Sequence, residues 1–440
     1  MLIFFERSPG SKRNPRRSPC EASQTAEDLW RAGKNNNLRI VNLRKFHEAL
    51  SLKCIAGVVA VVLLFAASAS SETLTSSGPI ALDGANGAVI SRMRITSTSG
   101  SCVTISNSTN VTIEKSEIGP CGEPDAKTPG NGISISGGGD IRIYDNYIHV
   151  DNQAAACCDT HDNILIRGSS NVIVQGNVIA YGETNVEVVG APSDHISVIG
   201  NFLLNPRGPF PRGQNFQSWG AEIWGPNRSI MVSDNYALSS QNSDVYRYRE
   251  NQEDSINFGY TSGAVVKGNY VSGGHSPSGC GIIADNQANG MQFLDNILSD
   301  TGQCGIGIAN GTSQTVRGNK ILNLTPVAGA GNTALYIWNQ YKTAPCGPVL
   351  LADNVADEVK SDGVSGSGFW NGGGCGAVTL TNNMWNQPAH EQLYPMSATN
   401  PPPAIPVRPK NCVAVSPYTT NKSLPSCDPP TATSSPSLSP

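Results

Sequence analysis

A short motif recurs nine times along the chain and limits the fold more than any other feature of the sequence. Each copy has alternating apolar residues, then Asp, Gly or Asn, then an Asn, then a second apolar stretch, as in IRIYDNYI (141–148) and VIVQGNVI (172–179). The gaps between successive copies vary from 23 to 35 residues. A solenoid explains this pattern, because its strands keep their length while the loops between them vary.

The Asn of the motif has a predicted structural role. It stands at Asn146, Asn177, Asn201, Asn235, Asn269, Asn296, Asn319, Asn354 and Asn383. Successive coils of a solenoid stack at about 4.8 Å, so one amide per coil at the same corner can hydrogen-bond the next. We therefore expect an asparagine ladder along one corner of the coil.

A second predicted strand precedes most copies of the motif. The segments GISIS (132–136), NVEVV (185–189) and GIGIA (305–309) are examples. Because the side chains of a strand alternate between its faces, Ile133 and Ile135 are expected to point into the core. The sequence lacks the leucine frame of leucine-rich repeats and the four-strand period of propeller blades, which disfavours both folds.

This pattern resembles the pectate-lyase-like superfamily over roughly residues 78–390. Four segments are also similar to a group of exported bacterial β-helix repeat proteins without a settled activity: EDSINFG (253–259), GGHSPSGCGII (273–283), GQCGIGIANG (302–311) and FWNGGGCG (369–376). The resemblance implies an all-β fold, a single-stranded right-handed parallel β-helix of about ten coils.

The ends of the chain differ from its repetitive body. Residues 1–54 form a basic leader with 11 Lys and Arg. An apolar run follows at 55–69, and we expect it to be a signal-peptide core with cleavage after Ala69. An uncleaved signal anchor is the alternative. Residues 397–440 form a Pro/Ser/Thr-rich tail that we expect to be extended.

These features predict an exported protein, either secreted or located in the periplasm or at the cell surface. After residue 54 the chain holds 19 basic and 29 acidic residues, and this acidic balance argues against a nucleic-acid partner. No membrane span is expected after signal cleavage, and we expect a monomer.

Ten cysteines follow the apolar run, an even number that is typical of disulfides in an exported chain. Cys280 and Cys304 stand 24 residues apart, one minimal coil, so stacking predicts a disulfide between them. Proximity suggests Cys346–Cys375 and Cys412–Cys427. Adjacent Cys157 and Cys158 are expected to pair elsewhere, with Cys102 and Cys121 as partners.

The outward positions of the second strands are candidates for chemistry. If AEIWG (221–225) is the strand one coil after NVEVV (185–189), then Glu187 and Glu222 are neighbours about 5 Å apart. Three interpretations remain open: a Ca²⁺ site with Asn185, the acid and nucleophile of a retaining glycoside hydrolase, or solvated surface acids without a role.

A second group of candidates is suited to binding sugars and uronates. Its expected outward or loop residues are Trp224, Tyr336, Trp338, Asn257 and Asp285 for substrate binding, and Arg247, Tyr248 and Arg249 for catalysis. Exposed aromatic rings stack on sugars, and Arg binds carboxylates through two parallel hydrogen bonds. His275 is a further candidate base. The segments NVEVVG and GAEIWG resemble the calcium-binding strands of the chondroitinase B and alginate lyase family, but the Lys-bearing segment that follows in that family is absent here.

The sequence thus favours a protein that acts on an extracellular polysaccharide, with a lyase of acidic, uronate-containing glycans as the first hypothesis. Ca²⁺ would neutralise the uronate carboxylate, and a base would remove the C5 proton. A non-catalytic glycan-binding or surface β-helix module is the alternative. A retaining glycoside hydrolase that uses Glu187 and Glu222 is a further one.

Overall fold

The computed structural model describes most of the repetitive body of the chain. The described residues are 74–122, 130–149, 162–208, 213–239, 252–274, 276–323, 325–328, 330–342, 344–359 and 367–385. The leader, the apolar run and the tail lie outside them, as does the Cys412–Cys427 prediction. Within the described part, we find no helical segment with the length and apolar character that crossing a bilayer requires.

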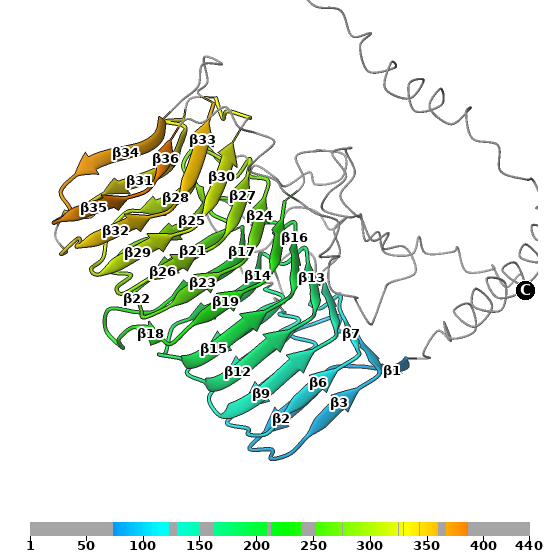
Figure 1. Cartoon of the computed structure of the whole chain (residues 1–440). Coiled ribbons are helices and arrows are strands. Elements are labelled where there is room, and N and C mark those ends of the chain that lie inside the picture. The colour runs from blue at the N-terminus through cyan, green and yellow to red at the C-terminus, as the bar shows by residue number, and fades with distance from the viewer. Residues whose placement is uncertain are drawn as a thin grey trace, which may run out of the picture. The chain divides into compact units, whose positions relative to one another are not determined.

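Three parallel sheets run side by side along the described chain, and each coil contributes one strand to each sheet (Figure 1). The 12-stranded sheet contains β1 (Thr75–Ser77), β4 (Met93–Ile95), β7 (Glu117–Ile118), β10 (Tyr147–His149), β13 (Val178–Ala180), β16 (Phe202–Leu204), β20 (Tyr236–Leu238), β24 (Tyr270–Ser272), β27 (Ile297–Ser299), β30 (Lys320–Asn323), β33 (Val355–Glu358) and β36 (Met384–Trp385).

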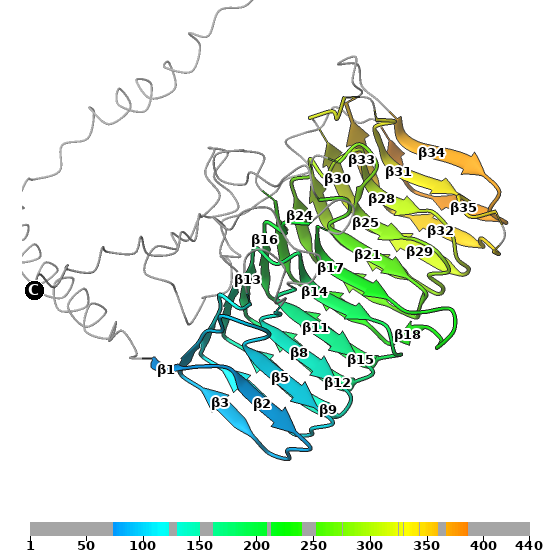
Figure 2. The same ribbon diagram turned by 180° about the vertical axis from the view of Figure 1, so that it is seen from behind.

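The 11-stranded sheet, whose outer face is turned to the viewer in Figure 2, contains β2 (Ile80–Asp83), β5 (Val103–Ser106), β8 (Ile133–Ser136), β11 (Ile164–Arg167), β14 (Thr184–Val189), β17 (Gln214–Trp219), β21 (Ile256–Gly259), β25 (Cys280–Ala284), β28 (Cys304–Ile308), β31 (Thr333–Trp338) and β34 (Ser367–Gly373).

The 13-stranded sheet contains β3 (Val89–Ser91), β6 (Thr112–Glu114), β9 (Gly139–Tyr144), β12 (Ser170–Gln175), β15 (Asp194–Ile199), β19 (Met231–Ser233), β23 (Val265–Lys267), β26 (Gln292–Leu294), β29 (Gln314–Arg317), β32 (Val349–Ala352) and β35 (Val378–Thr381), with the short strands β18 (Asn227–Arg228) and β22 (Thr261–Ser262) beside them.

This arrangement is a right-handed parallel β-helix, as the repeats predict. All strand pairs are parallel and join equivalent residues of successive coils; Ile133, Ile164 and Val186 stand in one such row. Their side chains are fully buried in one continuous apolar core. Burial of aliphatic side chains, worth roughly 25 cal/mol per Å² of apolar surface, therefore stabilises every coil.

The asparagine ladder is confirmed over its whole length. The side-chain amide of each motif Asn donates to the side-chain oxygen of the next, from Asn146 to Asn177 (3.0 Å) through to Asn354 and Asn383 (2.8 Å). The same oxygens also accept main-chain N–H groups, as Asn235 Oδ1 does from Asn201. The ladder thus satisfies buried polar groups at the turn of every coil that carries the motif.

Two further predictions about the scaffold have clear outcomes. The disulfides Cys280–Cys304 and Cys346–Cys375 are both present. The prediction that Cys102 and Cys121 pair with Cys157 and Cys158 is wrong, because Cys102 and Cys121 bond each other. Cys157 and Cys158 lie outside the described residues.

The assignment of AEIWG (221–225) as a strand of the 11-stranded sheet is also wrong. That place is taken by β17, in which Gln217 is the register partner of Glu187. Residues 221–225 instead form a tight turn closed by hydrogen bonds from Trp224 and Gly225 to the carbonyl of Ala221. Glu222 and Trp224 therefore project from this turn and are exposed.

Candidate functional site

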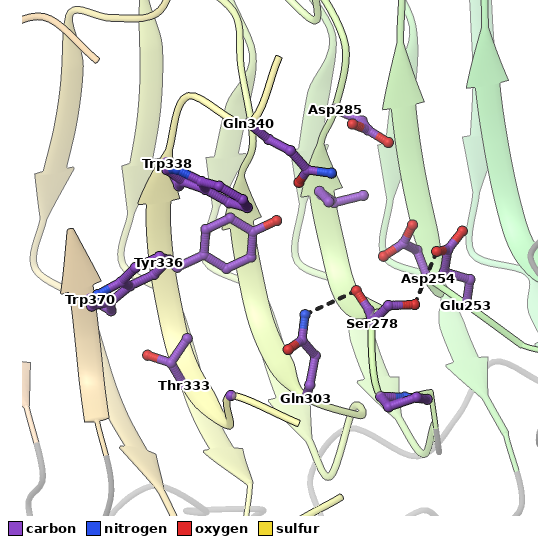
Figure 3. Close-up of a pocket in the computed structure, with 13 residues that line it drawn as sticks. Glu253, Asp254, Ser278, Asp285, Gln303, Thr333, Tyr336, Trp338, Gln340 and Trp370 are labelled. Carbon is purple, nitrogen blue, oxygen red and sulfur yellow. Dashed lines mark hydrogen bonds between the residues drawn. The ribbon is translucent and has the colours of Figure 1, made fainter. Parts of the chain in front are cut away.

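A cavity of about 600 Å³ lies on the outer face of the 11-stranded sheet, over β21, β25, β28, β31 and β34. Figure 3 shows aromatic side chains on one side and carboxyl groups on the other. Its 13 described lining residues include three carboxyls and no Lys, Arg or His. They are Glu253, Asp254, Pro277, Ser278, Ile283, Asp285, Gln303, Gly331, Thr333, Tyr336, Trp338, Gln340 and Trp370.

Asp254 is the most buried of the three carboxyls, with 2% of its surface exposed. Its Oδ1 accepts the main-chain N–H of Cys280 at 2.7 Å, and its Oδ2 accepts the side-chain amide of Asn257 at 2.7 Å. Burial raises the pKa of Asp254 well above its usual range, and the neighbouring Glu253 raises it further, against the lowering effect of the Cys280 N–H. Asp254 therefore holds a proton far more readily than an ordinary aspartate.

Asp285 lies next to Asp254 and accepts hydrogen bonds from more donors than Asp254 does. Burial also raises the pKa of Asp285, while hydrogen bonds from the Tyr341 hydroxyl, the Asn286 main chain and the Asn257 side chain oppose that rise. Asn257 thus contacts both aspartates. The charge of Asp285 adds to the rise at Asp254, so both carboxyls hold a proton more readily than ordinary aspartates do.

Glu253 is the third carboxyl and is half-buried. Burial raises the pKa of Glu253, and a hydrogen bond from Ser278 Oγ to its Oε1 at 3.2 Å partly opposes the rise. Ser278 belongs to a short loop that Ser276 stabilises by accepting the N–H groups of Ser278 and Gly279. The loop therefore fixes one wall of the cavity.

The opposite wall is aromatic. Tyr336 is 7% exposed, whereas Trp338 and Trp370 are 36% and 47% exposed. The Trp370 ring centroid lies 6.1 Å from that of Trp338 and 6.3 Å from that of Tyr336. The Tyr336 ring lies over Gly307, because a Cβ there would come within 2.7 Å of the ring. Absence of a side chain at Gly307 thus makes room for the ring between the carboxyls and the tryptophans.

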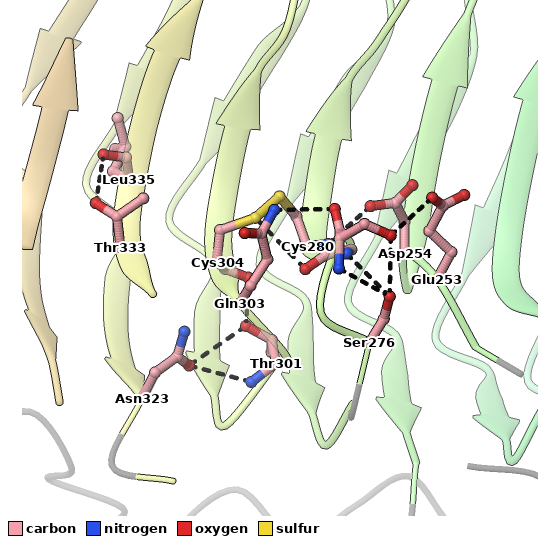
Figure 4. Close-up of a disulfide and its surroundings, with 12 residues drawn as sticks. Glu253, Asp254, Ser276, Cys280, Thr301, Gln303, Cys304, Asn323, Thr333 and Leu335 are labelled. Atoms are coloured by element: carbon pink, nitrogen blue, oxygen red, sulfur yellow. Dashed lines mark hydrogen bonds between the residues drawn. A yellow bond between two sulfur atoms is a disulfide. The ribbon is translucent and has the colours of Figure 1, made fainter. Parts of the chain in front are cut away.

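The Cys280–Cys304 disulfide lies at the edge of this cavity and joins β25 to β28 (Figure 4). Gln303, which precedes the second cysteine, donates to the carbonyl of Ser278 at 3.0 Å. Thr301 donates to the carbonyl of Cys304 at 3.0 Å and also bonds Asn323 of the next coil. The crosslink thereby connects the loop, the Cys280 N–H and the neighbouring coils into one support for Asp254.

Some of the predicted substrate-binding residues lie at the cavity, and one does not. Tyr336, Trp338 and Asp285 line the cavity, and Asn257 lies beneath it as a buried contact of Asp254. Trp224 stands elsewhere, on the turn after β17 with its ring near Gly190. The predicted catalytic residues Arg247, Tyr248 and Arg249 lie outside the described residues, as does His275.

The predicted Ca²⁺ ligands do not come together. The side-chain oxygen of Asn185 already accepts hydrogen bonds from Asn163 and Gly182 within a second, buried ladder. Glu222 is exposed on its turn, outside the register of Glu187. These three residues therefore do not fit a shared cation site, and the described residues hold no other group of three or more His, Cys, Asp or Glu suited to a metal.

Glu187 has a different carboxyl neighbour from the one predicted. It hydrogen-bonds Asp162, a buried residue whose Oδ1 also accepts the N–H of Thr184 at 3.1 Å. Burial raises the pKa of Asp162 well above its usual range, and the charges of Glu187 and Glu183 add to this rise. Asp162 lies just before β11 and Glu187 lies on β14, two coils before β21, which follows the cavity residues Glu253 and Asp254.

Sequence reasoning gave no role to several residues of the cavity. Asp254 and Glu253 end a charged loop segment, and their position directly before the strand SINFG was the available signal. Trp370 belongs to FWNGGGCG, one of the segments that carry the family resemblance. Gln303 belongs to GQCGIGIANG, another of those segments, whereas Gln340 has no comparable sequence signal.

Comparisons with known proteins agree with this fold. Residues 79–203 match the family model described as right handed beta helix region. Together with the sheet topology, this match confirms the right-handed parallel β-helix that the repeats predict. No curated protein matches the sequence.

Solved β-helix structures resemble the chain at low identity. The DFA-IIIase from Arthrobacter chlorophenolicus A6 is 10% identical with a TM-score of 0.46, over 70% of this chain and 83% of that one. The alginate lyase from Paenibacillus sp. is 11% identical with a TM-score of 0.40, over 70% and 99%. The Dettilon tailspike protein is 12% identical with a TM-score of 0.45, over 70% of this chain, and the match spans 61% of the tailspike.

Proposed function

We propose that the protein binds a neutral glycan on the outer face of its 11-stranded sheet and cleaves it by general acid–base hydrolysis. One observation carries this proposal: a cavity with neighbouring carboxyls of raised pKa on one side and tryptophans on the other. Aromatic rings accept the apolar faces of sugars. The carboxyls supply the proton donor and the base that glycoside hydrolysis requires.

The two aspartates have separate roles in this proposal. Asp254, buried and held protonated, donates its proton to the oxygen of the leaving sugar. Asp285, which accepts hydrogen bonds from Tyr341 and Asn257, acts as the carboxylate that attacks the sugar or activates water. Burial raises the pKa of both aspartates, and the additional hydrogen bonds that Asp285 accepts favour its ionised form relative to that of Asp254, the kind of difference by which hydrolases divide these tasks.

A lyase of uronate-containing glycans, the first hypothesis from the sequence, is the second candidate. Elimination requires a cation beside the uronate carboxylate. The described lining has three carboxyls and no Lys, Arg or His that could supply this charge. Arg247, Arg249 and His275, which lie outside the described residues, keep this candidate open to experiment. Three disulfides, bonds typical of exported proteins, are compatible with an extracellular glycan for either reaction.

A panel of polymers separates these functions. The protein is incubated with neutral glycans such as xylan, mannan, inulin and cello-oligosaccharides, and with alginate, pectate, chondroitin and hyaluronan, with Ca²⁺ or a chelator. New reducing ends from a neutral glycan support the proposal. Absorbance of unsaturated uronates would replace it with the lyase. Retention on a glycan in an affinity gel without any cleavage would leave a binding module.

The Asp254→Asn variant tests the catalytic assignment. We expect its activity to fall by about 10²–10⁴-fold, the usual contribution of a general acid, while circular dichroism stays unchanged. Asp295→Asn is the matched control, because Asp295 is exposed at a corner of the coil where Asn382 occupies the equivalent position in a later repeat. Full activity of Asp254→Asn would remove Asp254 from the mechanism.

A further inference from the structure

A row of outward residues crosses five successive coils of the 11-stranded sheet and extends beyond the cavity. The strand registers place Trp219 beside Gly259, and in the next three coils Asp285, Ala309 and Trp338 directly follow the last paired residues Ala284, Ile308 and Ile337. At a strand spacing of about 4.8 Å, the two tryptophans stand about 19 Å apart along the helix axis. Asp285 occupies the middle of the row.

The Trp219 ring leans toward the carboxyls. A Cβ placed on Gly259 would come within 2.4 Å of the ring, so the ring lies over the glycine of the next coil and fills the space that the missing side chain leaves. Trp219 remains partly exposed in this position. Its indole therefore offers a face to solvent one coil away from Asp285, on the side opposite Trp338.

Tyr260 completes this second aromatic group. Its ring meets that of Trp219 edge-on, with centroids 6.3 Å apart and an interplanar angle of 69°. The Tyr260 hydroxyl accepts a hydrogen bond from the side chain of Asn286 at 2.9 Å, and the main chain of Asn286 bonds Asp285. The second aromatic group is thus connected directly to a carboxyl of the candidate site.

We infer that Trp219 and Tyr260 form a second sugar-binding subsite, and that a neutral oligosaccharide lies along the helix axis from this subsite across the carboxyls to the cavity. This inference rests on the proposed function and adds to it the size of the substrate and its mode of attack. A ligand of one or two sugar rings fills only the cavity side. A longer chain contacts Trp338 and Trp370 on one side of the carboxyls and Trp219 on the other.

The surroundings of Trp219 favour the same class of ligand. Gln217, the partly exposed residue on the same strand, offers an amide to sugar hydroxyls, whereas Gly259 and Ala309 are buried and add no exposed side chain between the two aromatic groups. Amides and aromatic faces suit neutral sugars, whose hydroxyls need donors and acceptors and whose C–H faces need an apolar surface. Bonds in the interior of a chain would therefore be cut, which releases oligosaccharides rather than single sugars.

Calorimetry with a ladder of neutral oligosaccharides tests this subsite. The glycan is the one identified by the polymer panel, and its oligomers are titrated into Asp254→Asn so that they are not consumed. We expect affinity to rise with chain length beyond the disaccharide. In the Trp219→Ala background, the longest oligomers should bind about tenfold more weakly, equivalent to about 1.4 kcal/mol, whereas disaccharide binding should change little.

Two further variants make the result specific. Trp219→Phe keeps an aromatic face and should restore most of the lost affinity. Met231→Ala removes an exposed apolar side chain from the 13-stranded sheet and should bind every oligomer as the parent does. Equal binding of all lengths by the Trp219→Ala variant and its parent would overturn the subsite while leaving the proposed function intact. Failure of every neutral glycan to bind would instead overturn the proposed function, and the subsite with it.

Discussion

The main-chain N–H of Cys280 donates a 2.7 Å hydrogen bond to Oδ1 of Asp254, and the side chain of the same cysteine forms the disulfide to Cys304. The crosslink thus fixes the donor that lowers the pKa of the proposed general acid. Replacing both cysteines by serine should lower kcat roughly tenfold to a hundredfold, the range for a misplacement near the reacting groups. It should also move the alkaline limb of the pH–rate profile to higher pH, because the pKa of Asp254 rises when that donor weakens.

The matched control removes another disulfide. Cys102→Ser with Cys121→Ser breaks the bond between two coils far from the cavity. Thermal unfolding should show a loss of stability for both double variants, about 2–5 kcal/mol each. If the control variant lost kcat and shifted its pH profile equally, the effect at Cys280 would be a general loss of stability rather than positioning of Asp254.

Tyr341→Phe tests the role of Asp285 as the ionised partner. The Tyr341 hydroxyl donates to Asp285 and lowers the pKa of that carboxyl against the effect of burial. Without the hydroxyl this pKa rises, so the acidic limb of the pH–rate profile should move to higher pH by about one unit. Tyr144→Phe, which removes a similar tyrosine–carboxyl bond to Glu114 on the 13-stranded sheet, should leave the profile unchanged. An unshifted limb in Tyr341→Phe would contradict the assignment of Asp285.

Glu358 gives a prediction about stability rather than activity. Burial raises the pKa of Glu358 from 4.5 to about 9, and Asn323 donates a 2.9 Å hydrogen bond to its Oε2. Between these pH values the folded protein keeps a proton that the unfolded chain has lost, so stability falls as pH rises, by up to about 1.4 kcal/mol per pH unit. Below pH 4.5 both states are protonated and the effect is absent.

Glu358→Gln should therefore raise the melting temperature near pH 8 and leave it unchanged near pH 4. Glutamine keeps an oxygen that accepts the hydrogen bond from Asn323, so the variant isolates the charge. Glu114→Gln should show no gain, since a hydrogen bond from Tyr144 lowers the pKa of Glu114. Parallel melting curves for wild type and Glu358→Gln across this pH range would mean that Glu358 ionises normally.

Asn235→Ala tests the ladder in the middle of the chain. Its side-chain oxygen accepts the N–H and the amide of Asn201, and both donors are left buried without it. We expect a loss of at least about 1–3 kcal/mol in the free energy of unfolding, measured by denaturant titration. Gln292→Ala, on the exposed face of β26, should change it by less than about 0.5 kcal/mol. A stability loss no larger than the control's would show that the ladder contributes little.

The β-helix could be predicted from the sequence because the interactions that stabilise it recur from coil to coil. One Asn per coil and alternating aliphatic residues recur at positions that stack, so each repeat supports the same interpretation. This consistency predicted the ladder, the inward Ile133 and Ile135, and the disulfide between Cys280 and Cys304, all of which the structure contains.

The prediction failed where a coil departs from aliphatic packing. In β17 the inward position after Phe216 holds Ser218, which is fully buried and bonds the hydroxyl of Thr261 at 2.9 Å. A polar residue at an inward position breaks the apolar alternation by which a strand is predicted. AEIWG, with its apolar Ile223 and Trp224, matched that alternation better. The error displaced Glu222 and Trp224 from the row that Gln217 and Trp219 occupy.

The carboxyl cluster was hidden for a different reason. Asp254 precedes its strand and reaches Cys280, 26 residues away, only through the stacking of coils, as Asp285 reaches Tyr341, 56 residues away. No local spacing encodes such contacts. They depend on the lengths of loops that differ from coil to coil, whereas the ladder depends only on what every coil shares.

The asparagine ladder has a consequence for how such a protein can change over generations. Each of its hydrogen bonds joins only neighbouring coils. Every coil with the motif therefore pairs with the next through the same hydrogen bonds, whatever the length of its loops. Duplication or loss of a whole repeat away from the carboxyls would leave the asparagine hydrogen bonds between the remaining coils intact. The loops can therefore diversify on a scaffold whose number of coils can itself change.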